Sequence, residues 1–199
     1  MFIRRESFKQ YTSLYPVVST LLAINLIVYI LSVLPSIGDQ IIGYGLAFNA
    51  AIAAGEWWRL ITAVFLHGGI THIIFNMFSL FVFAPELEKM VGRGKFLLIY
   101  FAAGIGGNIL TFVLQDSFYA SLGASGAIFG VFGAYLGLVA HTRNRIPQLK
   151  QVILPIVIVS IVMTFLSSNI NITAHLGGMA IGFILGYIIF RPKTKIRAI

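Results

Sequence analysis

Apolar stretches long enough to cross a membrane occupy most of this chain, and they constrain its fold more than any other feature. A membrane-spanning helix needs about 20 mainly apolar residues, whereas about a quarter of the residues in a soluble domain are charged. Here only 10% of the residues are charged, and the mean hydropathy is +0.93. We therefore predict an all-α polytopic membrane protein, a single domain of residues 1–199. Its six transmembrane helices are expected at roughly 15–35, 58–84, 95–115, 122–141, 150–168 and 172–190.

The basic residues gather at four places in the chain, and this distribution explains the net charge of +8. With six spans, all four places fall on one side of the membrane, and only Arg59 falls on the other. Cytoplasmic loops carry the excess of lysine and arginine, so we predict that both termini are cytoplasmic. The distribution favours a lipid bilayer and not nucleic acid as the partner. The four groups are Arg4, Arg5 and Lys9; Lys89, Arg93 and Lys95; Arg143, Arg145 and Lys150; and Arg191, Lys193, Lys195 and Arg197.

Residues 36–57 fit neither a solvated loop nor a transmembrane helix, because they are apolar yet interrupted by glycine and acidic residues. We predict an interfacial hairpin loop between helices 1 and 2. It ends in Glu56-Trp57-Trp58-Arg59, which combines aromatic anchors with an arginine, as expected at the headgroup level. A simple aromatic belt explains these residues equally well.

Two polar side chains in apolar surroundings indicate a hydrolytic site. Ser125 lies in Gly123-Ala124-Ser125-Gly126, and His175 lies in Ala174-His175-Leu176-Gly177-Gly178. Polar groups are costly in hydrocarbon and therefore indicate function, and a neutral imidazole can take the proton of a serine hydroxyl. Spans two, four and six run in the same direction, so their first turns share one depth. Span two adds His67, His72 and Asn76 at that depth.

Small residues recur at four-residue steps next to both positions, and such stripes let membrane helices approach closely. A purely packing role also explains the stripes, and an isolated serine can simply bond to its own backbone. The stripes are Ala174, Gly178, Gly182 and Gly186 in span six, and Gly126, Gly130 and Ala134 in span four.

Other classes of membrane protein fit these residues less well. The chain has no cysteine and no H-E-x-x-H motif, so we predict no metal and no cofactor. An intramembrane aspartyl protease needs two embedded aspartates, and no predicted span contains one. A proton-coupled transporter that uses His67, His72 and His175 as a relay stays open.

The motifs taken together resemble those of the rhomboid family of intramembrane serine proteases. The segment from His67 to Asn76, the Gly-Ala-Ser-Gly and Ala-His-Leu-Gly-Gly motifs, the Trp58-Arg59 pair and the position of Glu88 occur in the family's order and spacing. The resemblance covers nearly the whole chain, and Gly178 and Gly182 fit the pattern that follows the family's histidine.

The resemblance implies a catalytic dyad of Ser125 and His175, with His72 and Asn76 as donors to the oxyanion. We expect the Ser125 backbone N–H to be a further donor, because a helix N-terminus favours negative charge. The resemblance also implies that Phe129 stacks on the histidine, where the family often has tyrosine, and that His67 supports the site. The implied substrates are single-span proteins that are cut in or near the transmembrane segment, in a bacterial cell membrane. A catalytically inactive rhomboid-like binding protein is the alternative.

Substrate access follows from the pattern of span two. Phe75 precedes Asn76 and therefore points about 100° away from it around a helix. That face is expected to meet span five, which lacks glycine stripes and should pack more loosely. We predict that Phe75 and Phe165 form a lateral gate; simple contact with lipid is the alternative.

Overall fold

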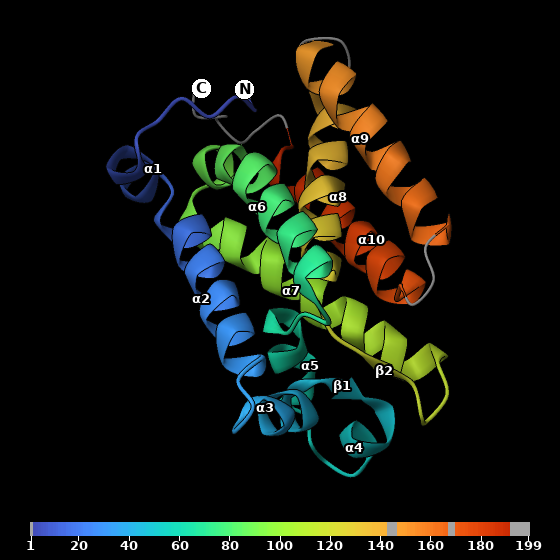
Figure 1. Ribbon diagram of the computed structural model, residues 1–199. Coiled ribbons are helices and arrows are strands. Elements are labelled where there is room, and N and C mark those ends of the chain that lie inside the picture. The colour runs from blue at the N-terminus through green and yellow to red at the C-terminus, as the bar shows by residue number, and fades with distance from the viewer. Residues whose placement is uncertain (1, 143–146, 167–169, 192–199) are drawn as a thin grey trace.

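The computed structural model describes residues 2–142, 147–166 and 170–191 (Figure 1). The basic residues Arg143, Arg145, Lys193, Lys195 and Arg197, and the end of the predicted span 150–168, lie outside them. Two short strands, β1 (Ala47–Phe48) and β2 (Ala120–Ser121), pair antiparallel. The helices are α1 (Phe8–Leu14), α2 (Pro16–Ser32), α3 (Gly38–Gly45), α4 (Asn49–Ala53), α5 (Arg59–Thr62), the 3₁₀ turn η1 (Ala63–Phe65), α6 (Ile70–Val91), α7 (Arg93–Leu114), α8 (Ser125–Thr142), α9 (Pro147–Leu166) and α10 (Ile172–Ile189).

Five helices in the described ranges, α6 to α10, are long and apolar enough to cross a membrane. A sixth span is counted when α1 and α2, bent by 111° relative to each other, are taken as one. Helix α2 has 17 residues and lies beside α6 (Figure 1). The predicted all-α polytopic membrane fold is therefore confirmed.

The second predicted span, residues 58–84, is not one helix, so its predicted boundaries are wrong. The chain forms α5, η1 and an irregular segment before α6 begins at Ile70 and continues to Val91. Gly69, immediately before α6, has a φ of 153°, a conformation that only glycine adopts readily. The backbone therefore changes direction here, and α6 is separate from the preceding segment. His67 consequently precedes α6 and does not lie on the same helix as His72.

The loop between α2 and α6 contains short helices and one strand. Its strand β1 pairs with β2, which follows α7, with Ala47 opposite Ser121. The short helices α3, α4 and α5 flank β1 and gather at the lower end of the molecule in Figure 1. We call this end, where α6, α8 and α10 begin, the loop end.

Helices α8 and α10 pack closely because the predicted small-residue stripes face each other. A Cβ at Gly178 would collide with the carbonyl oxygen of Gly126, and one at Gly182 would collide with that of Gly130. Most residues of α8 are buried, so it is the central helix of the bundle. This contact fixes the distance between the first turns of the two helices.

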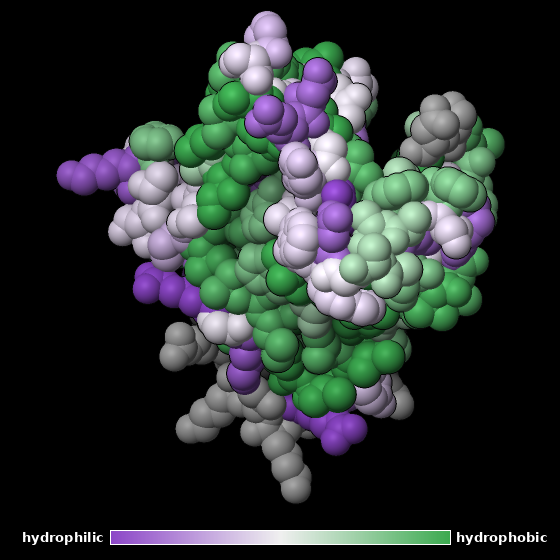
Figure 2. Space-filling model, turned by 90° about the horizontal axis from the view of Figure 1, so that it is seen from below, coloured by the Kyte–Doolittle hydropathy of each residue, from purple (hydrophilic) through white to green (hydrophobic). Residues whose placement is uncertain are grey.

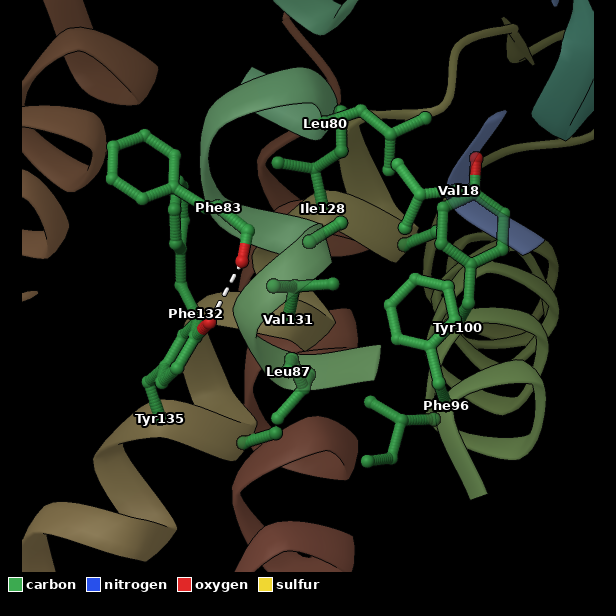
Figure 3. Close-up of a cluster of buried hydrophobic side chains, with 14 of the residues drawn as sticks. Val18, Leu80, Phe83, Leu87, Phe96, Tyr100, Ile128, Val131, Phe132 and Tyr135 are labelled. Carbon is green, nitrogen blue, oxygen red and sulfur yellow. Dashed lines mark hydrogen bonds between the residues drawn. The ribbon is translucent and has the colours of Figure 1, made fainter. Parts of the chain in front are cut away.

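The hydrophobic core lies between α2, α6, α7 and α8 (Figure 3). Tyr135 of α8 donates its hydroxyl to the Phe83 carbonyl of α6 at 2.7 Å. Pro85 has no N–H to donate to the Phe81 carbonyl, and the Tyr11 hydroxyl donates to that oxygen at 3.1 Å. These bonds give partners to two carbonyl groups of α6.

Two carboxylates hold the beginning of the chain against the end of α6. The Glu88 carboxylate accepts the backbone N–H groups of Val17 and Val18 at 3.2 and 2.9 Å. The first N–H groups of a helix have no acceptor inside it, so Glu88 caps α2 from a neighbouring helix. Arg4 forms an ion pair with Glu86 nearby.

The outward surfaces of the helices expose large hydrophobic side chains, such as Ile30 on α2, Phe78 on α6 and Val159 on α9. Figure 2, a view from the loop end, shows hydrophobic residues over much of this face, with hydrophilic residues between them. Soluble monomers rarely expose apolar patches of this extent, so contact with lipid explains the surface.

Candidate active site

Ser125 and His175 are held together at the loop end of the bundle. Ser125 is the first residue of α8, and His175 lies in the first turn of α10. The distance between Ser125 Oγ and His175 Nε2 is 2.7 Å, a short hydrogen bond. His175 is 7% exposed and Ser125 is half-buried, so the serine keeps the more accessible side of the pair.

Gly123 shapes the turn that leads into Ser125. Its φ of 138° favours glycine, and its N–H donates to the Ala63 carbonyl at 2.9 Å. A Cβ at this position would lie 2.8 Å from Nε2 of His72 and 3.5 Å from Ser125 Oγ. The missing side chain therefore leaves room between the serine and His72.

The first turn of α10 is anchored to α7 by polar side chains. Asn171 caps α10 by accepting the Ala174 N–H at 2.9 Å, and its amide donates to the Thr111 hydroxyl at 2.9 Å. Gln115 donates to the Thr173 hydroxyl at 2.9 Å. These bonds fix the position from which His175 projects toward α8.

The His175 ring has two further contacts. Phe129 of α8 stacks on it, with ring centroids 4.2 Å apart and an interplanar angle of 20°. The Thr164 hydroxyl of α9 lies 2.9 Å from His175 Nδ1. The sequence predicted the contact of Phe129 but not that of Thr164, because no motif indicates which residue a threonine in an apolar helix will contact.

His72 and Asn76 lie in the first two turns of α6. The Gly68 N–H donates to His72 Nδ1 at a long 3.4 Å, which leaves the proton of a neutral ring on Nε2, the atom facing Gly123. The Asn76 amide donates to the His72 carbonyl at 2.8 Å and retains a second N–H. His72 can thus offer a donor near Ser125, and Asn76 has a free donor one turn farther along α6.

His67 is 2% exposed and packs edge-on against His72, with ring centroids 5.1 Å apart. Neither of its ring nitrogens has a hydrogen-bond partner among the described residues. Its visible contribution to the site is therefore its contact with His72.

Trp58 and Arg59 hold the loop end together, and within the described ranges their side chains donate to loop carbonyls and not to Ser125 or His175. Arg59 is 5% exposed, donates to the Gly43 and Leu46 carbonyls at 2.8 and 2.9 Å, and pairs with Glu56. The Trp58 indole, half exposed, donates to the Tyr44 carbonyl at 3.1 Å. Arg59 is thus a buried residue that bonds the backbone of the loop.

The two predicted gate residues point away from the core. Phe75 is 67% exposed on α6, and Phe165 is 59% exposed on α9. Helix α9 is attached along one narrow stripe, since its buried residues are Leu149, Ile153, Val157 and Thr164.

The arrangement provides the parts for acyl transfer: a hydroxyl bonded to an imidazole, and donors beside them. Ser125 N–H is one such donor, because it lies in the first turn of α8, where N–H groups have no intrahelical acceptor. In the part of the chain that the structure describes, the group at His175 Nδ1 is a hydroxyl and not a carboxylate.

Comparison with known proteins identifies a family. Residues 54–192 match the model of the rhomboid domain. The chain is 43% identical to the putative rhomboid protease YdcA of Bacillus subtilis, over 98% of this chain and 99% of that protein. It is 42% identical to the rhomboid protease GluP of B. subtilis and 37% identical to RHOMBOID-like protein 6, mitochondrial, of Arabidopsis thaliana. These matches cover 78% and 75% of this chain but only 31% and 49% of those longer proteins.

The space at Gly123 gives a testable prediction. Gly123→Ala should slow the labelling of Ser125 by a serine-directed phosphonate by about 10²-fold, because the new methyl group displaces His72 or the serine. Gly55→Ala is the matched control: Gly55 also has a positive φ, of 105°, but a Cβ there meets nothing within 4 Å. Equal labelling of the two variants would contradict this account of Gly123.

Proposed function

The chain belongs to the rhomboid family and is a rhomboid-type serine protease, and we propose that it cuts a peptide bond in or near the transmembrane segment of membrane-protein substrates. In this proposal Ser125 is the nucleophile and His175 is its base. The observation that carries it is the 2.7 Å hydrogen bond between Ser125 Oγ and His175 Nε2.

The proposed reaction has two halves. His175 Nε2 takes the hydroxyl proton as Ser125 Oγ attacks the carbonyl carbon, and it then gives that proton to the leaving amine. The acyl group stays on Ser125 until water, deprotonated by the same nitrogen, attacks the ester and releases the acid. The stacked Phe129 ring keeps the imidazole in place through both halves.

The negative charge on the tetrahedral oxygen needs donors that are already in position. We assign this role to His72 Nε2–H, the second N–H of the Asn76 amide and the Ser125 backbone N–H. The geometry at Gly123 and the bond that fixes His72 Nδ1 support the assignment.

Access to the site is proposed to be lateral, between α6 and α9, past Phe75 and Phe165. The narrow buried stripe of α9 supports this route, because displacing the helix breaks few contacts. The protein is integral to the membrane, and we propose the bacterial cell membrane with both termini cytoplasmic. The described residues of the basic clusters support this orientation, since α1 and the junction of α6 with α7 lie at the end opposite the loop end (Figure 1).

The first prediction of this proposal concerns the dyad. Ser125→Ala and His175→Ala should each abolish cleavage of a single-span reporter by the reconstituted protein, and the double variant should be no worse, because residues that act as one unit are not additive. Phosphonate labelling should be lost in both single variants, while the thermal unfolding temperature stays near that of the wild type. Wild-type protein that neither labels nor cleaves would identify an inactive member of the family.

The second prediction concerns the oxyanion donors. His72→Ala and Asn76→Ala should each lower kcat by up to about 10²-fold with little change in KM, since the donors act on charge that develops only in the transition state. His141→Ala is the matched control, because His141 stacks on Tyr187 near the end of α8, far along the helix from Ser125. Wild-type kcat in both variants and in their double variant would require other donors.

The third prediction concerns the gate. The chain has no cysteine, so cysteines introduced on α6 and α9 can be joined by a reductant-cleavable thiol crosslinker. The crosslink should block cleavage of a transmembrane reporter but leave phosphonate labelling of Ser125 unchanged, and reductant should restore cleavage. A crosslink between α2 and α6 is the control. Unimpaired cleavage by the α6–α9 crosslinked protein would exclude this route.

A further inference from the structure

Thr164 is the one polar side chain among the buried residues of α9. The other buried residues, Leu149, Ile153 and Val157, lie on the same stripe and make apolar contacts with the bundle. Thr164 is 2% exposed and faces His175 from the side opposite Ser125, with its hydroxyl 2.9 Å from His175 Nδ1. The proposed proton transfers between Ser125 and His175 do not involve this hydroxyl.

The direction of this hydrogen bond follows from counting protons. A threonine hydroxyl has one proton to donate and lone pairs that accept. Thr164 Oγ1 also lies 2.8 Å from the Ser160 carbonyl oxygen, which can only accept. The hydroxyl proton therefore goes to Ser160, and Thr164 accepts the Nδ1–H of His175.

This direction selects one tautomer of the neutral imidazole. With the proton held on Nδ1, Nε2 carries the lone pair, and Nε2 is the atom 2.7 Å from Ser125 Oγ. A base must present a lone pair to the proton that it removes. In the other tautomer Nε2–H would donate to Ser125 Oγ, and the serine could not be deprotonated by that nitrogen.

We propose that Thr164 is a positioning residue that orients His175 and fixes its tautomer, so that α9 supplies the third member of the catalytic arrangement. The inference rests on the proposed function, because it assigns His175 as the base. In triads a carboxylate performs this task and also stabilises the imidazolium by its charge. A neutral hydroxyl performs only the orienting part, which suits a site surrounded by hydrocarbon, where an added charge is costly.

Thr164 lies on the helix that is proposed to move when substrate enters. The dyad residues come from α8 and α10, which pack rigidly through their glycines, whereas Thr164 comes from α9, the helix proposed to move. Displacement of α9 separates Thr164 from Nδ1, so the base is oriented only when α9 is seated. Entry of substrate and activation of the serine are thereby coupled through one hydrogen bond.

The test compares Thr164→Val, which keeps the shape and removes the hydroxyl, with Thr164→Ser, which keeps the hydroxyl. Thr164→Val should lower kcat for the reporter by about tenfold, the effect of one neutral hydrogen bond, with KM unchanged. The rate of phosphonate labelling should fall by the same factor, because labelling needs the oriented base but no lateral entry. Thr164→Ser should restore both rates to within about twofold of the wild type.

The matched control is Thr142→Val. Thr142 is also a buried threonine, and its hydroxyl also bonds the carbonyl four residues earlier, Leu138, at 3.0 Å, but it lies at the far end of α8. It should label at the wild-type rate. Thermal unfolding of each variant separates loss of fold from loss of orientation, and Thr164→Ala replaces Thr164→Val if the latter does not fold.

The outcomes separate this inference from the proposed function. If wild-type protein labels and cleaves but Thr164→Val labels equally fast, the role of Thr164 is overturned while the dyad stands. If Thr164→Ser is as slow as Thr164→Val, the hydroxyl is not the cause, and the role is overturned as well. If wild-type protein itself does not label, the proposed function fails first.

Discussion

The close contact between α8 and α10 is the constraint on which the site depends. Gly178 lies against the Gly126 carbonyl and Gly182 against that of Gly130, and neither position has space for a side chain. Without a hydrophobic driving force in lipid, such backbone contact is a main source of helix association. It sets the separation of the two first turns, and so brings Ser125 Oγ to 2.7 Å from His175 Nε2.

Polar groups in this bundle are satisfied by hydrogen bonds that cross between helices. Glu88 caps α2, Tyr11 and Tyr135 donate to carbonyls of α6, and Asn171 joins α10 to α7. Each bond removes the cost of an unpaired polar group in hydrocarbon. The proposed dyad likewise avoids an unpaired polar group, because a threonine hydroxyl bonds His175 Nδ1 at the position where soluble triads place a carboxylate.

Rigid and loosely attached elements have separate tasks. Helices α7, α8 and α10 carry the serine and the histidine on a frame held by glycines and anchoring amides. Helix α9 contacts this frame along one stripe and contributes Thr164. In the proposed function, the protein must keep Ser125 fixed and still admit a transmembrane substrate from the side. This division of tasks meets both needs, and the proposed Thr164 bond links them.

The sequence by itself determined the membrane class, the approximate bounds of every span but the second, and the polar residues at the loop end, because hydropathy, span length and small-residue spacing are local properties of the chain. Tertiary structure decided what depends on distant partners. The break at Gly69 arises from a backbone φ of 153°. The pairing of β1 with β2 and the burial of Arg59 against two carbonyls need segments far apart in sequence. Thr164 reads as one more residue of an apolar helix until folding brings its hydroxyl to His175, since a hydrogen bond is defined by distance and direction in space and not by position in the chain.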